Sequence, residues 1–279
     1  MKPSKLIRSM CAVLGIMAIG IAANSQADLY RVTSIAPGMS PFVVNTAIAK
    51  VVGKHVPGVD MQVRATGAAT RHVVEAATGK VDFFFNSGTI NWLMVKNLGP
   101  YKKMENAPEL EKNLGMIFNY EIGPYHYITR ADSGIEKLED IAGRKIFAGP
   151  PGGAAKRVCL GNIKKTTGLE GGKDFEAVDF GFDAAIQAFQ DDKIDVIVLS
   201  TNFPSSAVSQ FALTKKIRIL DIDTDKLSWG WPSWMSATVV EIPPMLTVIT
   251  KSIPVRCLHT ELWLTSPHAW IWMKKWFIR

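Results

Sequence analysis

Cysteine is scarce in this sequence, and the short patterns that usually mark metal, redox and nucleotide sites are missing. Three cysteines in 279 residues are too few for a disulfide scaffold. None belongs to a C-x-x-C pair, so structural zinc and thioredoxin-like chemistry lose their usual support. No G-x-G-x-x-G follows an expected strand, and the glycine-rich run at 149–157 lacks the Gly-Lys-Ser/Thr ending of a P-loop. We therefore expect no metal site and no cofactor.

Histidine and serine also give little indication of catalysis. The five histidines are scattered, and only His72 shares a helix face with an acid, Glu75, at a spacing more typical of a solvated surface pair than of metal ligands. Ser87 lies in Asn-Ser-Gly after an expected strand but lacks the G-x-S-x-G elbow, which favours a ligand-binding hydroxyl over a nucleophile. No acid, base and nucleophile come together, so we do not expect an enzyme.

Positive charge is in excess, but it is confined to the two ends of the sequence. The formal net charge is +7, which by itself would suggest a nucleic acid or an anionic membrane as a partner. Residues 1–27 contribute +3 and residues 244–279 contribute +4, whereas residues 28–243 carry 24 charges of each sign. Because the central part of the chain is formally neutral, we expect no nucleic-acid partner.

The first 27 residues resemble a secretory signal peptide. Lys2, Lys5 and Arg8 precede an uncharged apolar run of 14 residues, and small residues at 25–27 supply a cleavage site. A membrane-spanning helix needs about 20 apolar residues, so export is favoured over a transmembrane anchor. We expect a periplasmic protein.

Between residues 28 and 225, strand-like and helix-like segments alternate. Strands are expected at 29–34, 61–65, 81–85, 114–118, 125–129, 145–148, 177–180, 194–199 and 217–220. Ser40 and Pro41 are expected to begin a helix as its N-cap and first residue. The apolar face of that helix is expected to consist of Phe42, Val43, Ala47, Ile48, Val51 and Val52. The alternation predicts an α/β fold in which helices cover both faces of a largely parallel sheet.

Three polar turns lie where expected strands lead into helices: Ser40-Pro41, Thr66-Gly67-Ala68 and 150–153. The ligand crevice of an open α/β sheet lies at the carboxyl ends of its strands. Unpaired N–H groups and the helix dipole there can hold a carboxylate or phosphate. Any one of these turns is more simply explained as an ordinary connection, but three of them favour a shared anion site.

Several longer stretches resemble the solute receptors of tripartite ATP-independent periplasmic (TRAP) transporters, specifically the TAXI family. The most specific of them runs from Arg130 to Gly153, and weaker matches include Thr66–Thr70, Gly79–Asp82 and Gly181–Asp195. The resemblance implies a type II periplasmic-binding-protein architecture, in which two lobes with mixed or parallel sheets close on a small organic anion, an amino acid or a carboxylate such as glutamate. It also implies delivery of that solute to the membrane subunits of a TRAP transporter, without covalent chemistry.

The family's ligand contacts carry over to positions in both expected lobes. These positions are Thr33, Ser40, Pro41, Phe42, Thr66, Gly67, Ala68, Asn86, Ser87, Pro151, Gly152, Gly153 and Asn202. Ala68 and Ala69 stand where the family usually has Gly and Ser, so one hydroxyl contact is expected to be missing. An exported α/β enzyme acting on a small organic acid is the alternative, and it would require an activated nucleophile.

The resemblance divides the mature chain into lobe 1 (28–122), lobe 2 (123–225) and a return to lobe 1 (226–243). From Pro244 to the end the sequence no longer resembles the family. A reading-frame shift or truncation in the gene model is one hypothesis for this atypical tail. The other is a basic amphipathic segment that holds the protein at a membrane surface.

Overall fold

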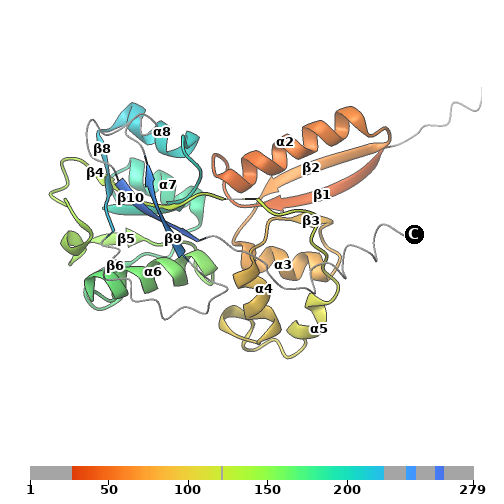
Figure 1. Ribbon diagram of the computed structural model, residues 1–279, viewed down its shortest axis with the longest axis horizontal. Helices are drawn as coiled ribbons and strands as arrows, with labels where there is room; N and C mark the ends of the chain where they lie inside the picture. The colour runs from red at the N-terminus through yellow and green to blue at the C-terminus, as the bar shows by residue number, and fades with distance from the viewer. Residues whose placement is uncertain (1–26, 121, 223–236, 243–254, 261–279) are drawn as a thin grey trace, which may run out of the picture.

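Two sheets, each flanked by helices, form the two lobes of the chain (Figure 1). The computed structural model describes residues 27–120, 122–222, 237–242 and 255–260. The elements of the first lobe are β1 (Asp28–Ser34), α2 (Ser40–His55), β2 (Val59–Ala65), α3 (Ala69–Ala77), β3 (Phe83–Phe84), α4 (Gly88–Val95), a 3-10 turn (Gly99–Tyr101) and α5 (Ala107–Glu111). Its three strands are parallel, in the order β2-β1-β3.

The second lobe repeats that strand order and adds antiparallel neighbours. Its elements are β4 (Tyr125–Arg130), a 3-10 turn (Leu138–Ile141), β5 (Lys145–Phe147), α6 (Ala154–Thr167), β6 (Glu176–Ala177), α7 (Phe182–Gln190), β7 (Val196–Ser200), α8 (Ser206–Thr214), β8 (Ile217–Leu220), β9 (Ala237–Ile242) and β10 (Val255–Thr260). Strands β6, β5 and β7 are parallel, and β4 pairs antiparallel with β7 and β8. The predicted α/β class, with two lobes and mixed or parallel sheets, is confirmed.

Residues 237–242 differ from the sequence expectation. They were expected to belong to a return to the first lobe, but β9 pairs antiparallel with β10, which joins the second sheet where Leu258 meets Tyr125. The pairing of β9 with β10 therefore places this part of 226–243 in the second sheet. The rest of the expected return, and most of the atypical tail, lie outside the described residues.

Strand β7 is buried on both faces, as its apolar sequence predicted. Its alternate residues enter two cores: Ile197 and Leu199 pack with α7 and α8, whereas Val196 and Val198 pack with α6. The three helices accordingly lie on opposite sides of the sheet (Figure 1). This arrangement directs the carboxyl ends of β5, β6 and β7 toward one edge of the lobe.

The first lobe covers its apolar side chains less completely. The prediction for α2 was wrong, because Val43 and Val51 are 49% and 59% exposed, and only Ser40 and Pro41 of this helix are buried. Met116, Ile117 and Phe118 are also exposed, and the expected strand at 114–118 does not form. The helix packs beside β1 and β2, where Phe42, Ile48 and Val52 are half-buried, so only part of the apolar face predicted from periodicity is covered.

Two further strands are shorter than expected. Only Phe83–Phe84 of the 81–85 segment and Glu176–Ala177 near the 177–180 segment form strands. In the first case backbone bonding continues past the strand, because the N–H of Phe85 donates to the Thr33 carbonyl at 3.3 Å. Within the described ranges, no helix is both long and apolar enough to cross a membrane.

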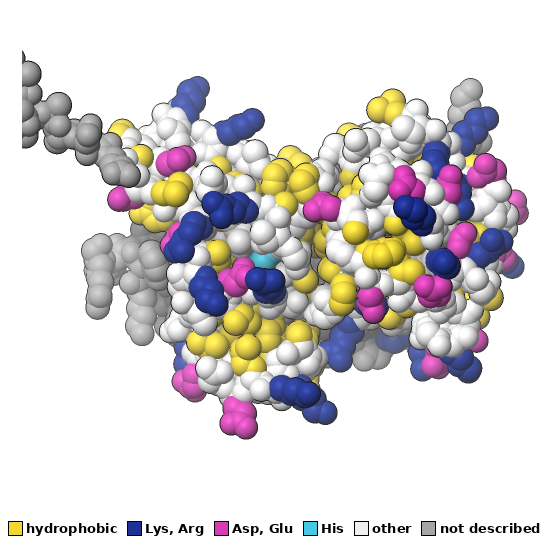
Figure 2. Space-filling model, turned by 180° about the vertical axis from the view of Figure 1, so that it is seen from behind, with side chains coloured by type: hydrophobic (Ala, Val, Ile, Leu, Met, Phe, Trp, Pro, Cys, Tyr) yellow, Lys and Arg dark blue, Asp and Glu magenta, His cyan; other side chains and the backbone are white. Residues whose placement is uncertain are grey.

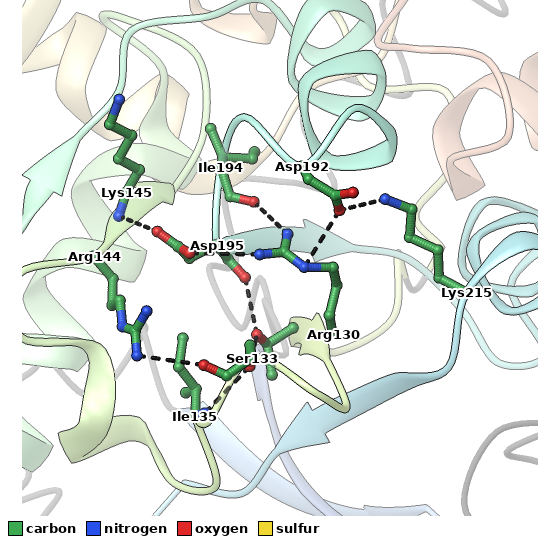
Figure 3. Close-up of polar contacts among 10 residues, drawn as sticks. Arg130, Ser133, Ile135, Arg144, Lys145, Asp192, Ile194, Asp195 and Lys215 are labelled. Carbon is green, nitrogen blue, oxygen red and sulfur yellow. Dashed lines mark hydrogen bonds and ion pairs between the residues drawn. The ribbon is translucent and has the colours of Figure 1, made fainter.

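A polar network braces the second lobe at the edge where β5 and β7 begin (Figure 3). The Arg130 guanidinium lies 3.3 Å from an Asp192 carboxylate oxygen and 3.5 Å from one of Asp195, and it donates to the Ile194 carbonyl at 3.0 Å. Asp195 also accepts the backbone N–H of Lys145 at 2.8 Å. Arg130 begins the stretch that most resembles the TAXI family, and its contacts stabilise the lobe at the end opposite the carboxyl ends of the strands.

Candidate functional site

The carboxyl ends of β1, β2 and β3 bring several predicted site residues to one edge of the first sheet. The backbone N–H of Thr66 donates to the Ser34 carbonyl at 2.9 Å, which ties the turn after β2 to the end of β1. The bond from Phe85 to Thr33 ties the end of β3, next to Asn86, to the same place. Thr33, Thr66 and Asn86 are therefore neighbours, as the parallel strand order requires.

Three oxygens at this edge are buried and unpaired. Thr33 is 5% exposed and Ser34 is 0% exposed, and neither hydroxyl has a hydrogen-bond partner among the described residues. The Asn86 side-chain carbonyl is in the same condition. Because buried polar atoms in native proteins are nearly always hydrogen-bonded, these three oxygens make this edge of the sheet a candidate site.

Ser34 was not among the predicted residues. It adjoins Thr33, and two small hydroxyl residues in succession at the end of an apolar strand were the available signal. Thr33 was predicted because the ligand contacts of the resembled family carry over to it, and that resemblance did not extend to Ser34, the last residue of β1.

Two helix N-termini, one from each lobe, face each other beside these oxygens. Helix α3 has Ala68 at its N-cap and α6 has Gly153, and neither residue has a side chain that can cap the first N–H groups. The Thr70 hydroxyl donates to the Gly152 carbonyl at 3.2 Å, which brings the two helix starts together across the lobes. The positive ends of both helix dipoles are thus available to an anion.

Gly67 shapes the first of these helix starts. Its φ of +51° lies in the left-handed region, which glycine adopts without the steric cost that a Cβ would impose. Thr66 and Gly67 are exposed and Ala68 is half-buried; on the other lobe, Pro151 and Gly152 are exposed and Gly153 is half-buried. These six positions can therefore be reached by a solute.

Ser40 and Asn202 contact each other instead of an open site. The Ser40 hydroxyl accepts the backbone N–H of Asn202 at 2.7 Å and donates to its side-chain oxygen at 2.8 Å. The prediction of Ser40 as N-cap was wrong, because Met39 holds that position and the Ser40 hydroxyl is engaged across the lobes. In the same turn Pro41 is buried and Phe42 is half-buried.

An apolar seam continues this contact between the lobes. Met39, which is 1% exposed, belongs with Ile35 and Ala36 to the core that contains Phe182 and Ala207 of the second lobe. Burying a side chain of this size contributes about 2 kcal/mol. The space-filling view shows the two lobes in contact, with a notch between them at the upper edge (Figure 2).

Ser87 and Asn86 have local partners as well as a position near the site. The Ser87 hydroxyl caps α4 by accepting the Ile90 N–H at 3.4 Å, which leaves its proton for a ligand. The Asn86 amide nitrogen donates to the Asn91 side chain. Both residues lie close to the strand ends, and the contact with Asn91 orients the Asn86 amide.

His72 is the functional candidate that sequence reasoning misjudged. It is 0% exposed, and its Nε2 contacts both the carbonyl oxygen of Thr66 and, at 3.1 Å, the Thr66 hydroxyl. The surface pair at this helix is Arg71 with Glu75, at 2.7 Å. Burial lowers the pKa of His72 below its ordinary value, which favours the neutral imidazole.

The described residues contain no cluster of three or more potential metal ligands. Charges of both signs are interspersed over the face shown in Figure 2. The candidate site at the strand ends consists of hydroxyls, an amide and backbone N–H groups, which can form hydrogen bonds but carry no formal charge.

Comparison with known proteins identifies a family and several similar structures. The model of the NMT1-like family matches residues 36–238. No curated protein sequence matches the chain.

The solved structures that resemble the chain include the periplasmic aliphatic sulphonate binding protein SsuA from Escherichia coli. It is 14% identical, with 72% of this chain and 58% of that chain covered, at a TM-score of 0.45. A TRAP periplasmic solute binding protein from Sulfitobacter with bound β-D-galacturonate is 18% identical, with coverages of 68% and 66% and a TM-score of 0.44.

A binding protein component of an ABC phosphonate transporter from Pseudomonas aeruginosa is 12% identical, with coverages of 90% and 74% and a TM-score of 0.48. The chain spans about three fifths of the length of the sulphonate-binding structure from Escherichia coli.

Proposed function

The chain belongs to the NMT1-like family, and from that membership and the site geometry we propose that it is a periplasmic solute-binding receptor. It captures a small organic anion, such as a carboxylate or an amino acid, between its two lobes. It then delivers that solute to the membrane subunits of a TRAP-type transporter, as a receptor of the TAXI type. Export by the leader at 1–27 gives it access to the solute.

One observation carries the proposal: unpaired buried oxygens and uncapped helix N-termini occur at the same edge. Thr33 and Ser34 supply hydroxyls that can donate to a carboxylate, and the starts of α3 and α6 supply N–H groups from opposite lobes. The Asn86 carbonyl oxygen can only accept, so it suits the ammonium group of an amino acid. A carboxylate accepts hydrogen bonds from N–H and O–H groups and is favoured by the positive ends of helix dipoles. An anion held there would touch both lobes.

The proposed contacts fall into two groups. The residues at the strand ends and helix starts bind the solute directly: Thr33, Thr66, Gly67, Ala68, Asn86, Ser87, Pro151, Gly152 and Gly153. The turn Ser40-Pro41-Phe42 and Asn202 form the second group, which contributes to binding indirectly. The hydrogen bonds between Ser40 and Asn202 hold the two lobes together.

The mechanism is a population shift between open and closed lobes. Contacts that require both helix starts exist only when the lobes are closed, so binding stabilises that form by the difference in affinity between the two states. Closure around hinges near Gly123 and Thr201 would present the filled receptor to the transporter. The Ser200 hydroxyl, which donates to the Gly123 carbonyl at 3.1 Å, lies at this crossing.

An exported enzyme is the alternative function. The Thr66–His72 pair is the part of the candidate site that could supply a nucleophile and a base. A nucleophilic hydroxyl needs a base that accepts its proton. The Nε2 of His72 faces the Thr66 carbonyl, which can only accept a hydrogen bond, so this nitrogen carries its own proton. The pair therefore supports binding and not nucleophilic catalysis.

A thermal-shift screen of organic acids and amino acids tests the proposal. A solute present at 100 times its Kd raises the free energy of unfolding by about 2.7 kcal/mol, so a true ligand raises the Tm clearly. Thr66→Trp should abolish the shift because the indole fills the helix start. Thr78→Trp is the matched control, since Thr78 is exposed at the far end of the same helix. If Thr66→Trp and Thr78→Trp give equal Tm shifts with the acid, the solute does not bind at the start of α3. If the protein converts the acid into another compound, the enzyme alternative is supported instead.

A further inference from the structure

The contact between His72 and Thr66 sets the direction of a hydroxyl at the binding edge. His72 is the fourth residue of α3, and its ring lies wholly inside the lobe while Thr66 stays exposed in the turn before the helix. One ring nitrogen, Nε2, touches both oxygens of Thr66. The other, Nδ1, is buried and has no partner among the described residues.

The chemistry of these atoms leaves one consistent arrangement. A carbonyl oxygen only accepts hydrogen bonds, so Nε2 carries the proton and donates it to the Thr66 carbonyl. The Thr66 hydroxyl shares the same N–H and can act toward it only as an acceptor. A proton on Nδ1 would be buried without an acceptor, which is costly. The imidazole is therefore neutral and protonated at Nε2.

The Thr66 hydroxyl therefore does not donate its own proton to His72. We infer that His72 is a positioning residue that turns the Thr66 hydroxyl into a hydrogen-bond donor aimed at the solute. The inference rests on the proposed function, because it gives Thr66 the polarity that an anionic solute requires. His72 itself is too deeply buried to touch the solute.

The buried ring has a second effect on the same turn. By holding the Thr66 carbonyl it turns that acceptor away from the edge where Ala68 begins the helix start. A carbonyl oxygen directed toward an anion would repel it, so removing the acceptor from the edge favours carboxylates over cations. His72 thus contributes to the selectivity of the site for anions without contacting the ligand.

Two substitutions separate positioning from general packing. The amide nitrogen of Gln reaches as far from the backbone as Nε2, whereas that of Asn reaches only as far as Nδ1. His72→Gln should keep the affinity for the acid found in the screen within about threefold. His72→Asn should lose about tenfold, which corresponds to one hydrogen bond. Equal losses in both variants, with equal Tm values, would overturn the inference.

Long-range proton–nitrogen NMR of His72 in the intact protein provides a readout that does not depend on any solute. The expected spectrum shows a neutral ring with the proton on Nε2. A proton on Nδ1 would overturn the inference and would make the Thr66–His72 pair a candidate nucleophile and base. If no acid binds the unaltered protein, the proposed function fails while this spectrum still decides the tautomer.

Discussion

Removing the Ser40 hydroxyl is expected to loosen the junction between the lobes. Ser40 is 3% exposed and makes two hydrogen bonds to Asn202, one to the backbone and one to the side chain. A buried hydrogen bond contributes about 0.5–1.5 kcal/mol, and an unsatisfied N–H adds to the loss. For Ser40→Ala we expect the closed form to lose about 2 kcal/mol, which is roughly a 30-fold change in the ratio of closed to open molecules.

Ser206→Ala is the matched control for this experiment. The Ser206 hydroxyl also joins the lobes, donating to the Gly38 carbonyl at 3.0 Å, but Ser206 is exposed, so water replaces the lost bond. Its expected cost is about 0.5 kcal/mol. Small-angle X-ray scattering without solute should show a larger radius of gyration for Ser40→Ala than for Ser206→Ala, and a weaker affinity for the acid. If the two variants have the same radius and affinity, Ser40 does not fasten the lobes and the reasoning is refuted.

Three other results are expected. Arg130→Met should lower the free energy of unfolding by about 2–3 kcal/mol, measured by urea denaturation, because it removes charged hydrogen bonds. The Kd for the acid should not change. A higher Kd would contradict the view that the Arg130 network stabilises the lobe without taking part in binding. Burial lowers the pKa of His126 to about 4, against 6.5 when exposed, so the unfolded chain binds more protons between these values. Stability should therefore be full above pH 6.5 and fall by on the order of 3 kcal/mol as the pH drops to 4; urea midpoints that do not change over this range would show that the ring is not buried. Gly123→Ala should lower the Tm far more than Gly67→Ala, since a Cβ at Gly123 would lie 2.3 Å from the Thr201 carbonyl oxygen and one at Gly67 meets nothing closer than 3.9 Å; equal Tm losses would refute the close packing of Gly123 against Thr201.

The sequence predicted the parts of the fold that local patterns determine. Strand β7 was expected as a segment buried on both faces, and its residues enter two cores. The start of α6 after the Gly-Pro-Pro-Gly-Gly turn was also expected, because glycine and proline fix backbone conformation locally. The three polar turns were correctly placed near helix starts for the same reason.

Contacts between distant residues could not be predicted in this way. The partner of Ser40 is 162 positions away, so a serine before a proline was taken for a helix cap. His72 and Glu75 have the spacing of a surface pair, but the helix is rotated so that His72 faces the interior and Glu75 pairs with Arg71. All the apolar residues of α2 were assumed to face the sheet, but the rotation of the helix against β1 and β2 leaves Val43 and Val51 exposed.

The central claim is that an organic anion binds between the lobes at the carboxyl ends of the strands. A crystal structure of the protein with the acid selected by the thermal-shift screen tests it most directly. The account predicts that the acid's carboxylate lies within hydrogen-bonding distance of the Thr66 hydroxyl and the first N–H groups of α3 and α6, with contacts to both lobes. An acid that binds elsewhere, or touches only one lobe, would contradict it.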